Sequence, residues 1–201
     1  MKIIVLTGLT GSGKSSISSP TTKKYDLPIL ETGDIVYETV KERGLEITPE
    51  NIKTVSVEAK KISDAFFTEK LVEKARKLYS DKPAICVSGV RAVSEVEFLR
   101  KEFGHKNVIV IGFHASQDTR FHRLGNEDRK LHSGAKAAED AALLNIDDFL
   151  AREIKELGFG IGSVFALADI IISNDDKNYP YLTVNHNQFI FEAVVKRFID
   201  S

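Results

Sequence analysis

The sequence predicts an α/β fold in which a parallel five-stranded sheet is flanked by helices. Five short apolar runs are rich in β-branched residues and nearly continuous, the pattern of strands that are buried on both faces. These runs are KIIVLTG at 2–8, PIL at 28–30, PAICVSG at 83–89, NVIVIGFH at 107–114 and ADIIISN at 168–174. Helix-like segments separate them, and strands that alternate with helices form parallel sheets through right-handed crossovers. We therefore expect a ligand site beyond the carboxyl ends of the strands.

The chain length and composition predict a single domain over residues 1–201. With 201 residues and 42% hydrophobic content, the chain can bury one substantial core. The net charge of −1 excludes a bulk attraction to nucleic acid or to an anionic membrane. The single cysteine, Cys86, permits no internal disulfide and no cysteine pair for a metal. No apolar run is long enough for a membrane span or a signal peptide, so we expect a soluble, cytoplasmic protein.

The first apolar run leads directly into GLTGSGKS, residues 8–15, which matches the phosphate-loop pattern G-x-x-x-x-G-K-[ST] in full. Glycines let successive backbone N–H groups point at one anion, and the start of the following helix adds partial positive charge. The lysine reaches the outer phosphates, and the serine hydroxyl can ligate Mg²⁺. The loop therefore predicts that a nucleoside triphosphate binds to Gly8, Gly11, Ser12, Gly13, Lys14 and Ser15.

The helix expected after this loop contains Pro20, about two turns from its start. Proline in a helix interior removes one hydrogen bond and clashes with the preceding turn. We therefore expect this helix to be short or kinked near Ser18–Ser19. Its phosphate-binding end is unaffected, because that end uses only the first turn.

Three further segments have sequence features of a helix, namely an N-terminal cap, a C-terminal glycine or an apolar face. The first covers about 48–80 and opens with Thr48 as N-cap and Pro49 at the first helical position. The second, at 91–104, ends on a glycine. The third, at 189–199, has one apolar face, which is expected to pack on the sheet or to cover a partner surface. That face consists of Phe191, Val194, Val195 and Phe198.

The stretch from 118 to 144 differs from the rest because it is polar and alanine-rich. Between positions 120 and 136 its basic residues outnumber the acidic ones. The basic residues are Arg120, Arg123, Arg129, Lys130 and Lys136, and the acidic ones are Glu127 and Asp128. This composition favours a mobile insertion over a core element. A solvated helical hairpin with ordinary surface charges is the alternative.

The chain lacks the Asn-Lys-x-Asp guanine signature of GTPases and shows a different resemblance. LETGDIVYETVKERG at 30–44 resembles the acceptor segment of adenylate kinases, which carry T-G-D, an apolar pair and an arginine. SGVRAVSEVEFLRKEFG, HASQDTRFHRL, FLAREIKELGFGIGSVFALAD and IIISND resemble the archaeal adenylate-kinase-related proteins, a family related to adenylate kinase and dephospho-CoA kinase. The resemblance covers about residues 2–176. It implies a P-loop fold like that of nucleoside monophosphate kinases, with an acceptor-binding helical segment at about 31–80 and a small helical lid at about 118–150.

The resemblance assigns the acceptor side to three residues. Thr32 and Gly33 stand where these kinases touch the acceptor base, and Arg91 stands where an arginine holds the acceptor phosphate. Arg91 could also be an ordinary residue in the first turn of its helix. The helix dipole disfavours a cation there, so a bound phosphate is the better explanation.

The resemblance also assigns catalytic roles to Lys14 and to three arginines. Arg120 and Arg123 match arginines at the hinge of the lid, and Arg152 matches one near its exit that reaches the transferring phosphoryl group. Such a set aligns two anions and neutralises their charge, and the lid excludes water. Arg120 and Arg123 are three residues apart on one helix face, which fits a shared phosphate or a solvated surface. Arg152 could instead form surface pairs beside Glu153.

Two residues depart from the kinase pattern, and both stand at positions that bind Mg²⁺ waters or a phosphate in those kinases. Ser88 stands where the kinases carry an aspartate that orients waters around Mg²⁺, and its hydroxyl brings no charge to hold the ion. Tyr37 stands where an arginine of the acceptor segment would clamp a phosphate, and tyrosine cannot replace a bidentate guanidinium. Ser15 and Ser88 are therefore the candidate Mg²⁺ residues. Asp34 is the acidic residue of the acceptor segment that can act as a general base.

Three functions are compatible with these residues. The first is an active kinase that uses ATP and Mg²⁺ on a small-molecule acceptor, with a nucleotide as one candidate. The second is a nucleotide-binding or regulatory protein that has lost catalysis and uses ATP or AMP as a signal. The third, a nucleic-acid-linked ATPase, is disfavoured by the neutral net charge. No membrane partner is expected, and the sequence predicts no particular oligomeric state.

Overall fold

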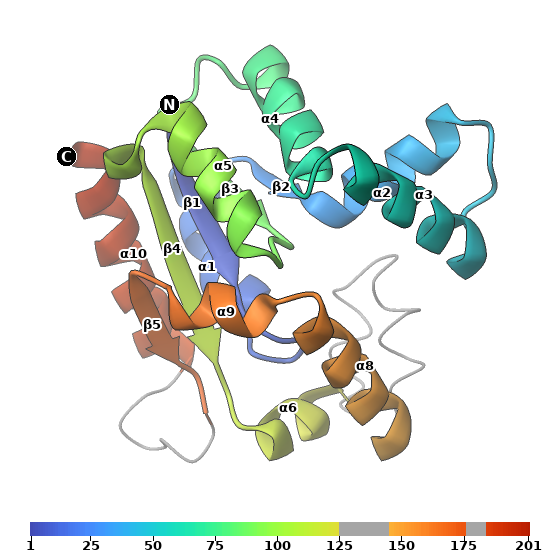
Figure 1. Cartoon of the computed structure of the whole chain (residues 1–201). Helices are drawn as coiled ribbons and strands as arrows, with labels where there is room; N and C mark the ends of the chain where they lie inside the picture. The colour runs from blue at the N-terminus through green and yellow to red at the C-terminus, as the bar shows by residue number, and fades with distance from the viewer. Residues whose placement is uncertain (125–144, 176–183) are drawn as a thin grey trace.

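The computed structural model describes residues 1–124, 145–175 and 184–201. Five strands form one sheet in the order β2-β3-β1-β4-β5, and every neighbouring pair is parallel (Figure 1). The strands are β1 (Lys2–Thr7), β2 (Ile29–Glu31), β3 (Ala84–Ser88), β4 (Val108–His114) and β5 (Ile170–Ser173). The predicted parallel five-stranded sheet is thus confirmed, and each apolar run supplies one strand.

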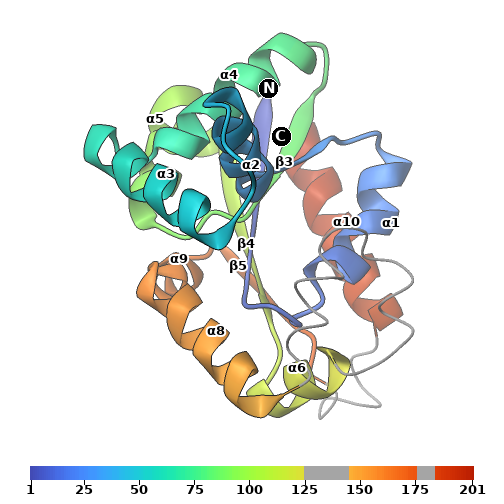
Figure 2. The ribbon, with the colours of Figure 1, turned by 90° about the vertical axis from the view of Figure 1, so that its right-hand side faces the viewer.

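Helices cover both faces of this sheet. Figure 2 shows α1 and α10 on one face and α4, α5 and α9 on the other. The described helices are α1 (Lys14–Lys24), α2 (Thr32–Glu42), α3 (Pro49–Ile62), α4 (Phe66–Leu78), α5 (Val93–Phe103), α6 (Gln117–Leu124), α8 (Ile146–Gly158), α9 (Ile161–Ala166) and α10 (Val184–Asp200), with a 3₁₀ turn at His105–Asn107. None of the helices described here is long and apolar enough to cross a membrane.

The sheet has a separate core on each face because successive strand residues point to opposite sides. Ile3 and Val5 of β1 pack in the core beneath α4, α5 and α9. Ile4 and Leu6 pack in the core beneath α1 and α10. Phe191 of α10 is fully buried in this second core, so the predicted packing of the C-terminal helix on the sheet is confirmed.

Helix α1 continues through Pro20 to Lys24, so the short helix expected there is wrong. Pro20 has no N–H to donate to the carbonyl oxygen of Ser16, four residues earlier. The side chain of Gln188 in α10 donates to that carbonyl oxygen instead, at 2.8 Å. A partner from the other end of the chain therefore replaces the helical hydrogen bond that proline removes.

The helical segment predicted at 48–80 is two helices in the structure. Thr48 is the N-cap of α3, as predicted, and its hydroxyl accepts a hydrogen bond from the Asn51 N–H at 3.2 Å. The chain leaves the helix at Ser63, whose hydroxyl accepts a hydrogen bond from the Ala65 N–H at 3.1 Å. Serine competes with helical hydrogen bonding in this way, which separates α3 from α4.

Candidate active site

A large cleft opens at the carboxyl end of the sheet, between the phosphate loop and the segments that follow β2 and β3. Its volume is about 830 Å³. Eight of the residues singled out from the sequence line it, namely Gly8, Lys14, Gly33, Asp34, Tyr37, Ser88, Arg91 and Arg152. The fold therefore brings the phosphate loop, the acceptor segment and two of the arginines around one space.

Close packing explains why the phosphate loop needs its central glycines. Gly11 and Gly13 have positive φ angles of 85° and 89°. A Cβ on Gly13 would lie 2.1 Å from Nδ2 of Asn174, and one on Gly11 would lie 2.9 Å from the carbonyl oxygen of Arg120. Larger residues at these positions would strain the backbone and push the loop away from its neighbours.

The loop ends in the first turn of α1, which has Gly13 as its N-cap and no acidic side chain in that turn. The positive end of this helix is thereby left for an anion. Nζ of Lys14 donates a hydrogen bond to the carbonyl oxygen of Gly8 and lies 3.4 Å from that of Leu9. Ser15 is exposed beside it. The loop thus offers backbone N–H groups, one ammonium group and one hydroxyl to a phosphate chain.

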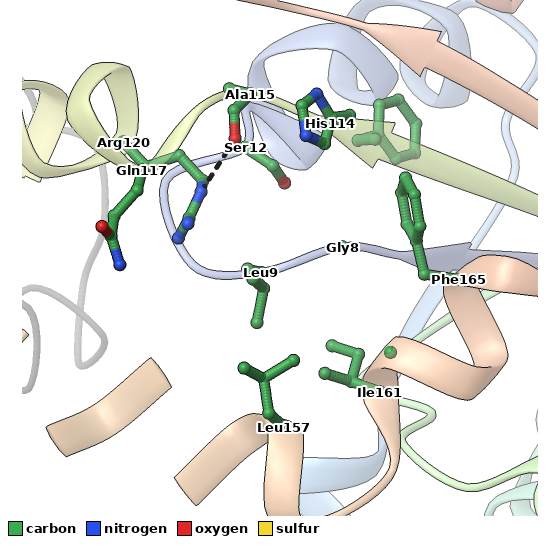
Figure 3. A pocket seen from close by; sticks show the side chains of 12 residues that line it. Gly8, Leu9, Ser12, His114, Ala115, Gln117, Arg120, Leu157, Ile161 and Phe165 are labelled. Atoms are coloured by element: carbon green, nitrogen blue, oxygen red, sulfur yellow. Dashed lines mark hydrogen bonds between the residues drawn. The ribbon is translucent and has the colours of Figure 1, made fainter. Parts of the chain in front are cut away.

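Arg120 is buried against the phosphate loop by hydrogen bonds and an ion pair. Its guanidinium donates to the carbonyl oxygens of Ala115 at 3.0 Å (Figure 3) and of Thr10 at 3.3 Å. It also forms an ion pair with Glu153 of α8, and it lies over the Phe149 ring. The interpretation of 118–144 as a solvated or mobile insertion is therefore wrong for α6, and residues 125–144 lie outside the described part.

Arg123 lies one turn further along α6 and also reaches the phosphate loop. Its guanidinium donates to the carbonyl oxygen of Asn174 at 2.8 Å and to that of Gly11 at 3.5 Å. The side-chain amide of Asn174 in turn donates to the carbonyl oxygen of Ser12 at 3.0 Å. Both α6 arginines thus hold carbonyl oxygens of the loop, and the segment after β5 supports the loop from the same side.

Arg152 and Glu156 connect α8 to the tip of the phosphate loop. The Thr10 hydroxyl donates to Oε1 of Glu156 at 3.0 Å, and Nε of Arg152 lies 3.5 Å from the same oxygen. Glu156 is only 7% exposed, although it lines the cleft. The alternative that Arg152 forms surface pairs along its helix is confirmed in part, because the pair with Glu156 lies along α8 but its carboxylate is buried.

Sequence reasoning missed the two buried carboxylates of α8. Glu153 and Glu156 follow Phe149 by four and seven residues, so they share the buried face of the helix with a fully buried aromatic ring. An acidic residue on an apolar face is rarely left unpaired. That spacing was the signal available in the sequence, and it would have indicated buried partners for both carboxylates.

The acceptor segment contributes differently at each of its residues. Gly33 and Asp34, in the first turn of α2, are exposed and line the cleft, and Tyr37 is half-buried one turn later. Thr32 is buried instead, and it packs so closely on Gly89 that a Cβ there would lie 2.4 Å from its hydroxyl oxygen. Thr32 therefore fixes the end of β3 rather than lining the cleft.

Arg91 lines the cleft just before α5 and not within its first turn, because that helix begins at Val93. The Arg91 backbone N–H donates to Oε2 of Glu95 at 2.8 Å. The Arg91 guanidinium lies 5.4 Å from the centre of the Phe159 ring, a cation–π distance. An aromatic contact leaves the N–H groups at the edge of the guanidinium able to donate to an anion.

Ser88 ends β3 and is 5% exposed at the floor of the cleft. Its register partner on the neighbouring strand is Glu31, which also lines the cleft and which sequence reasoning missed. Within the described residues, no group of three or more His, Cys, Asp or Glu side chains could hold a metal ion. Mg²⁺ commonly binds through phosphate, water and only one or two protein groups. The two hydroxyls predicted from the sequence, on Ser15 and Ser88, fit that requirement, and the Glu31 carboxylate beside Ser88 is a further oxygen ligand available at the cleft.

The fold and the loop together define a P-loop nucleotide-binding protein. A family model described as an AAA domain matches residues 7–140. Two curated relatives are UPF0200 proteins. The chain is 37% identical to one from Methanocaldococcus jannaschii, over 87% of this chain and 82% of the relative. It is 32% identical to another from Pyrococcus horikoshii, over 99% of this chain and 98% of the relative. The chain therefore belongs to the UPF0200 family, with an AAA-type P-loop domain, and the predicted P-loop kinase-like family is confirmed.

A solved structure gives the same fold at lower sequence similarity. The shikimate kinase from Bacteroides thetaiotaomicron superimposes with a TM-score of 0.53 at 15% identity, over 97% of this chain and 98% of that one. At this identity the likeness concerns the fold alone. It agrees with a parallel sheet that carries a phosphate loop at the carboxyl end of its first strand.

Proposed function

We propose that this protein is a Mg²⁺-ATP-dependent phosphotransferase whose acceptor is a nucleotide or a nucleotide-like small molecule. One observation carries the proposal: Lys14 of the phosphate loop shares a single cleft with Arg91 and with Asp34 of the acceptor segment. A phosphoryl-transfer enzyme needs its donor and acceptor groups around one space. The P-loop kinase fold supports the same class of reaction.

In this proposal, the loop N–H groups and Lys14 hold the donor phosphates, and Arg91 holds an anionic group of the acceptor. Asp34 accepts the proton of the attacking hydroxyl. Arg152 lies in the same cleft and stabilises the charge of the transferring group. Ser15 and Ser88 would hold Mg²⁺ together with water, and a bound Mg²⁺ would neutralise part of the phosphate charge.

We propose positioning roles for Arg120 and Arg123. Both donate to carbonyl oxygens of the phosphate loop, and the charge of Arg120 is matched by Glu153. The two arginines then act on the phosphates through the shape of the loop. This division leaves Lys14, Arg91 and Arg152 as the cations that line the cleft near the proposed chemistry, together with Lys41 at the acceptor side.

The second candidate is a nucleotide-binding protein without turnover, and the buried Ser88 favours it. This side chain stands at the proposed Mg²⁺ position and carries no charge. Glu31 on the neighbouring strand argues for activity, because it supplies a carboxylate to the same cleft. Comparing ADP formation by Ser88→Asp with ADP formation by Glu31→Gln separates the two candidate functions.

The test is ADP formation from Mg²⁺-ATP with a panel of acceptors that includes AMP and dephospho-CoA. We expect ADP formation that depends on an acceptor and is lost in Lys14→Ala. Arg91→Ala should raise the KM for a phosphorylated acceptor and leave ATP affinity unchanged. If only Ser88→Asp turns over, the natural protein is the nucleotide binder of the second candidate. If Arg91→Ala weakens both ligands equally, the assigned role of Arg91 is wrong.

A further inference from the structure

A second, smaller cavity lies between the phosphate loop, the end of β4 and the α8–α9 connection, with a volume of about 210 Å³. Figure 3 shows Leu9, Leu157, Ile161 and Phe165 arranged around it. Its lining shares only Gly8 and Ile161 with the large cleft. Lys14, Ser88 and Arg152 line the cleft and not this cavity, so the cavity is a separate space that meets the cleft at Gly8 and Ile161.

The hydroxyl of Ser12 is directed into this smaller cavity. Ser12 is 1% exposed, and its Oγ has no hydrogen-bond partner within the described residues. Figure 3 shows the oxygen turned toward the space bounded by His114 and Phe165. Buried hydroxyls in folded proteins nearly always have a partner. An acceptor or donor atom of a ligand in the cavity would supply one.

The charged and amide groups around the cavity are already paired. Among the described lining residues Arg120 is the only Lys or Arg, and it forms an ion pair with Glu153. The Gln117 amide donates to the same carboxylate. His114 is exposed at the rim, with its ring centre 6.1 Å from that of Phe165. An anionic ligand would therefore meet no uncommitted Lys or Arg here.

We propose that this cavity binds a small neutral molecule that consists of an apolar ring and one hydroxyl or carbonyl group. The ring packs on Leu157, Ile161 and Phe165, and the polar group pairs with the Ser12 hydroxyl. A buried apolar cavity of about 150 Å³ is large enough for benzene. The cavity beside the phosphate loop therefore holds one ring with a substituent. This inference does not depend on the proposed phosphotransferase activity.

The experiment is a titration of the full chain with phenol, followed by NMR of ¹³C-labelled leucine and isoleucine methyl groups. We expect the Leu9, Leu157 and Ile161 signals to shift together, with one dissociation constant on the order of 1 mM, as suits a ligand of about seven heavy atoms. The same shifts should persist with saturating Mg²⁺-ATP. Loss of the phenol shifts in Mg²⁺-ATP would place phenol in the nucleotide cleft and overturn the proposal.

A pair of glycine variants tests the location of the ligand. Gly162 lines the cavity, and a Cβ there would make an ordinary 3.6 Å contact with Leu157. Gly162→Leu should therefore fill space and weaken phenol binding by about tenfold or more. Gly158→Leu is the matched control, because nothing lies within 4 Å of its Cβ and it is outside the cavity lining. Equal phenol affinity in both variants would refute the location.

The Ser12 hydroxyl has its own test, which also serves if Gly162→Leu fails to fold. The natural chain should bind phenol more tightly than toluene, which has a ring of the same size and no hydroxyl. In Ser12→Ala this preference should disappear, because phenol then loses its hydrogen-bond partner. An unchanged preference in Ser12→Ala would show that the hydroxyl does not recognise the ligand. No methyl shift with either probe would overturn the proposal as a whole.

Discussion

Arg120 and Glu153 form an ion pair in which both side chains are more than nine-tenths buried. The pair connects α6 to α8, and Arg120 also donates to the Thr10 carbonyl oxygen of the phosphate loop. A buried charge is tolerated only when it is matched. The shape of the loop therefore depends on a carboxylate, that of Glu153, which comes from a helix far later in the chain.

Removing the carboxylate of this pair should destabilise the fold strongly. We expect Glu153→Gln to lower the free energy of unfolding by about 3–5 kcal/mol, because the Arg120 charge stays buried without its partner. Urea denaturation measures this loss. Asp148→Asn, an exposed change on the same helix, should cost about 1 kcal/mol or less. Equal losses in the two variants would contradict the role of the ion pair.

Gly13→Ala should reduce ATP affinity through steric strain, although the substitution removes no group that binds a phosphate. The new Cβ would lie 2.1 Å from Asn174 Nδ2, and the residue would keep a φ of 89°. We expect the ATP affinity measured by calorimetry to fall at least about tenfold. A distortion of the loop that costs only about 1.4 kcal/mol of binding free energy is enough for this decrease. Gly158→Ala, with open space around its Cβ, should bind ATP as the natural chain does.

The hydrogen bond between Gln188 and Ser16 should contribute more to the free energy of unfolding when Pro20 is present than when it is replaced. We expect Gln188→Ala to cost about 0.5–1.5 kcal/mol of unfolding free energy, the net value of one hydrogen bond. In a Pro20→Ala background the helix supplies its own N–H to Ser16, so the same substitution should cost less. A double-mutant cycle measures the difference. Equal costs in both backgrounds would show that Gln188 does not replace the lost helical bond.

Cys86 should resist alkylation while the chain is folded. Burial raises the pKa of its thiol to about 12, so almost no thiolate exists near neutral pH. We expect iodoacetamide to label the native protein at pH 8 only as fast as it unfolds. Labelling in urea should be rapid, which serves as the control. Rapid labelling without denaturant would mean that β3, which carries Cys86, is open to solvent.

Glu192 of α10 should make stability depend on acid pH. Hydrogen bonds from Lys24 and Tyr25 lower the pKa of this carboxyl below its usual value. Its contribution is therefore present above the unfolded-state pKa and lost as the pH falls through the lower, folded-state pKa. Glu192→Gln should lower Tm at pH 7 and leave Tm nearly unchanged at pH 2. An equal decrease at both pH values would exclude the ionised carboxylate as the cause.

The sheet and the phosphate loop were predictable because their signals are local. Each strand is a short apolar run, and GLTGSGKS is contiguous in the sequence. The segment at 48–80 was predicted only in part, because a single serine side chain ends α3. The length of α1 could not be predicted, because Gln188, which lies 172 residues from Ser16, donates the hydrogen bond to Ser16 that Pro20 removes.

The candidate site in the cleft could likewise be predicted only in part from the sequence. The phosphate-loop motif identified Lys14, and the family resemblance indicated Asp34 and Arg91, which the fold brings to the same cleft. Periodicity gave no warning that Arg120 is buried, because its partner Glu153 comes from a helix beyond the lid segment. Glu31 lies at the site because the strand register places it opposite Ser88, and this register could not be read from the sequence. Pairings over long sequence distances decide such residues, and a local pattern does not contain them.

The support that α10 gives to α1 has a consequence for protein synthesis. The nucleotide motif is translated well before α10, yet Gln188 of α10 bonds to the helix that follows the motif, and Asn187 pairs with the Asn174 side chain that supports Ser12. A ribosome-bound chain that has not released α10 thus carries the complete motif without its supports. Nucleotide affinity should then develop only when α10 docks, and it would distinguish chains that contain α10 from chains truncated before it.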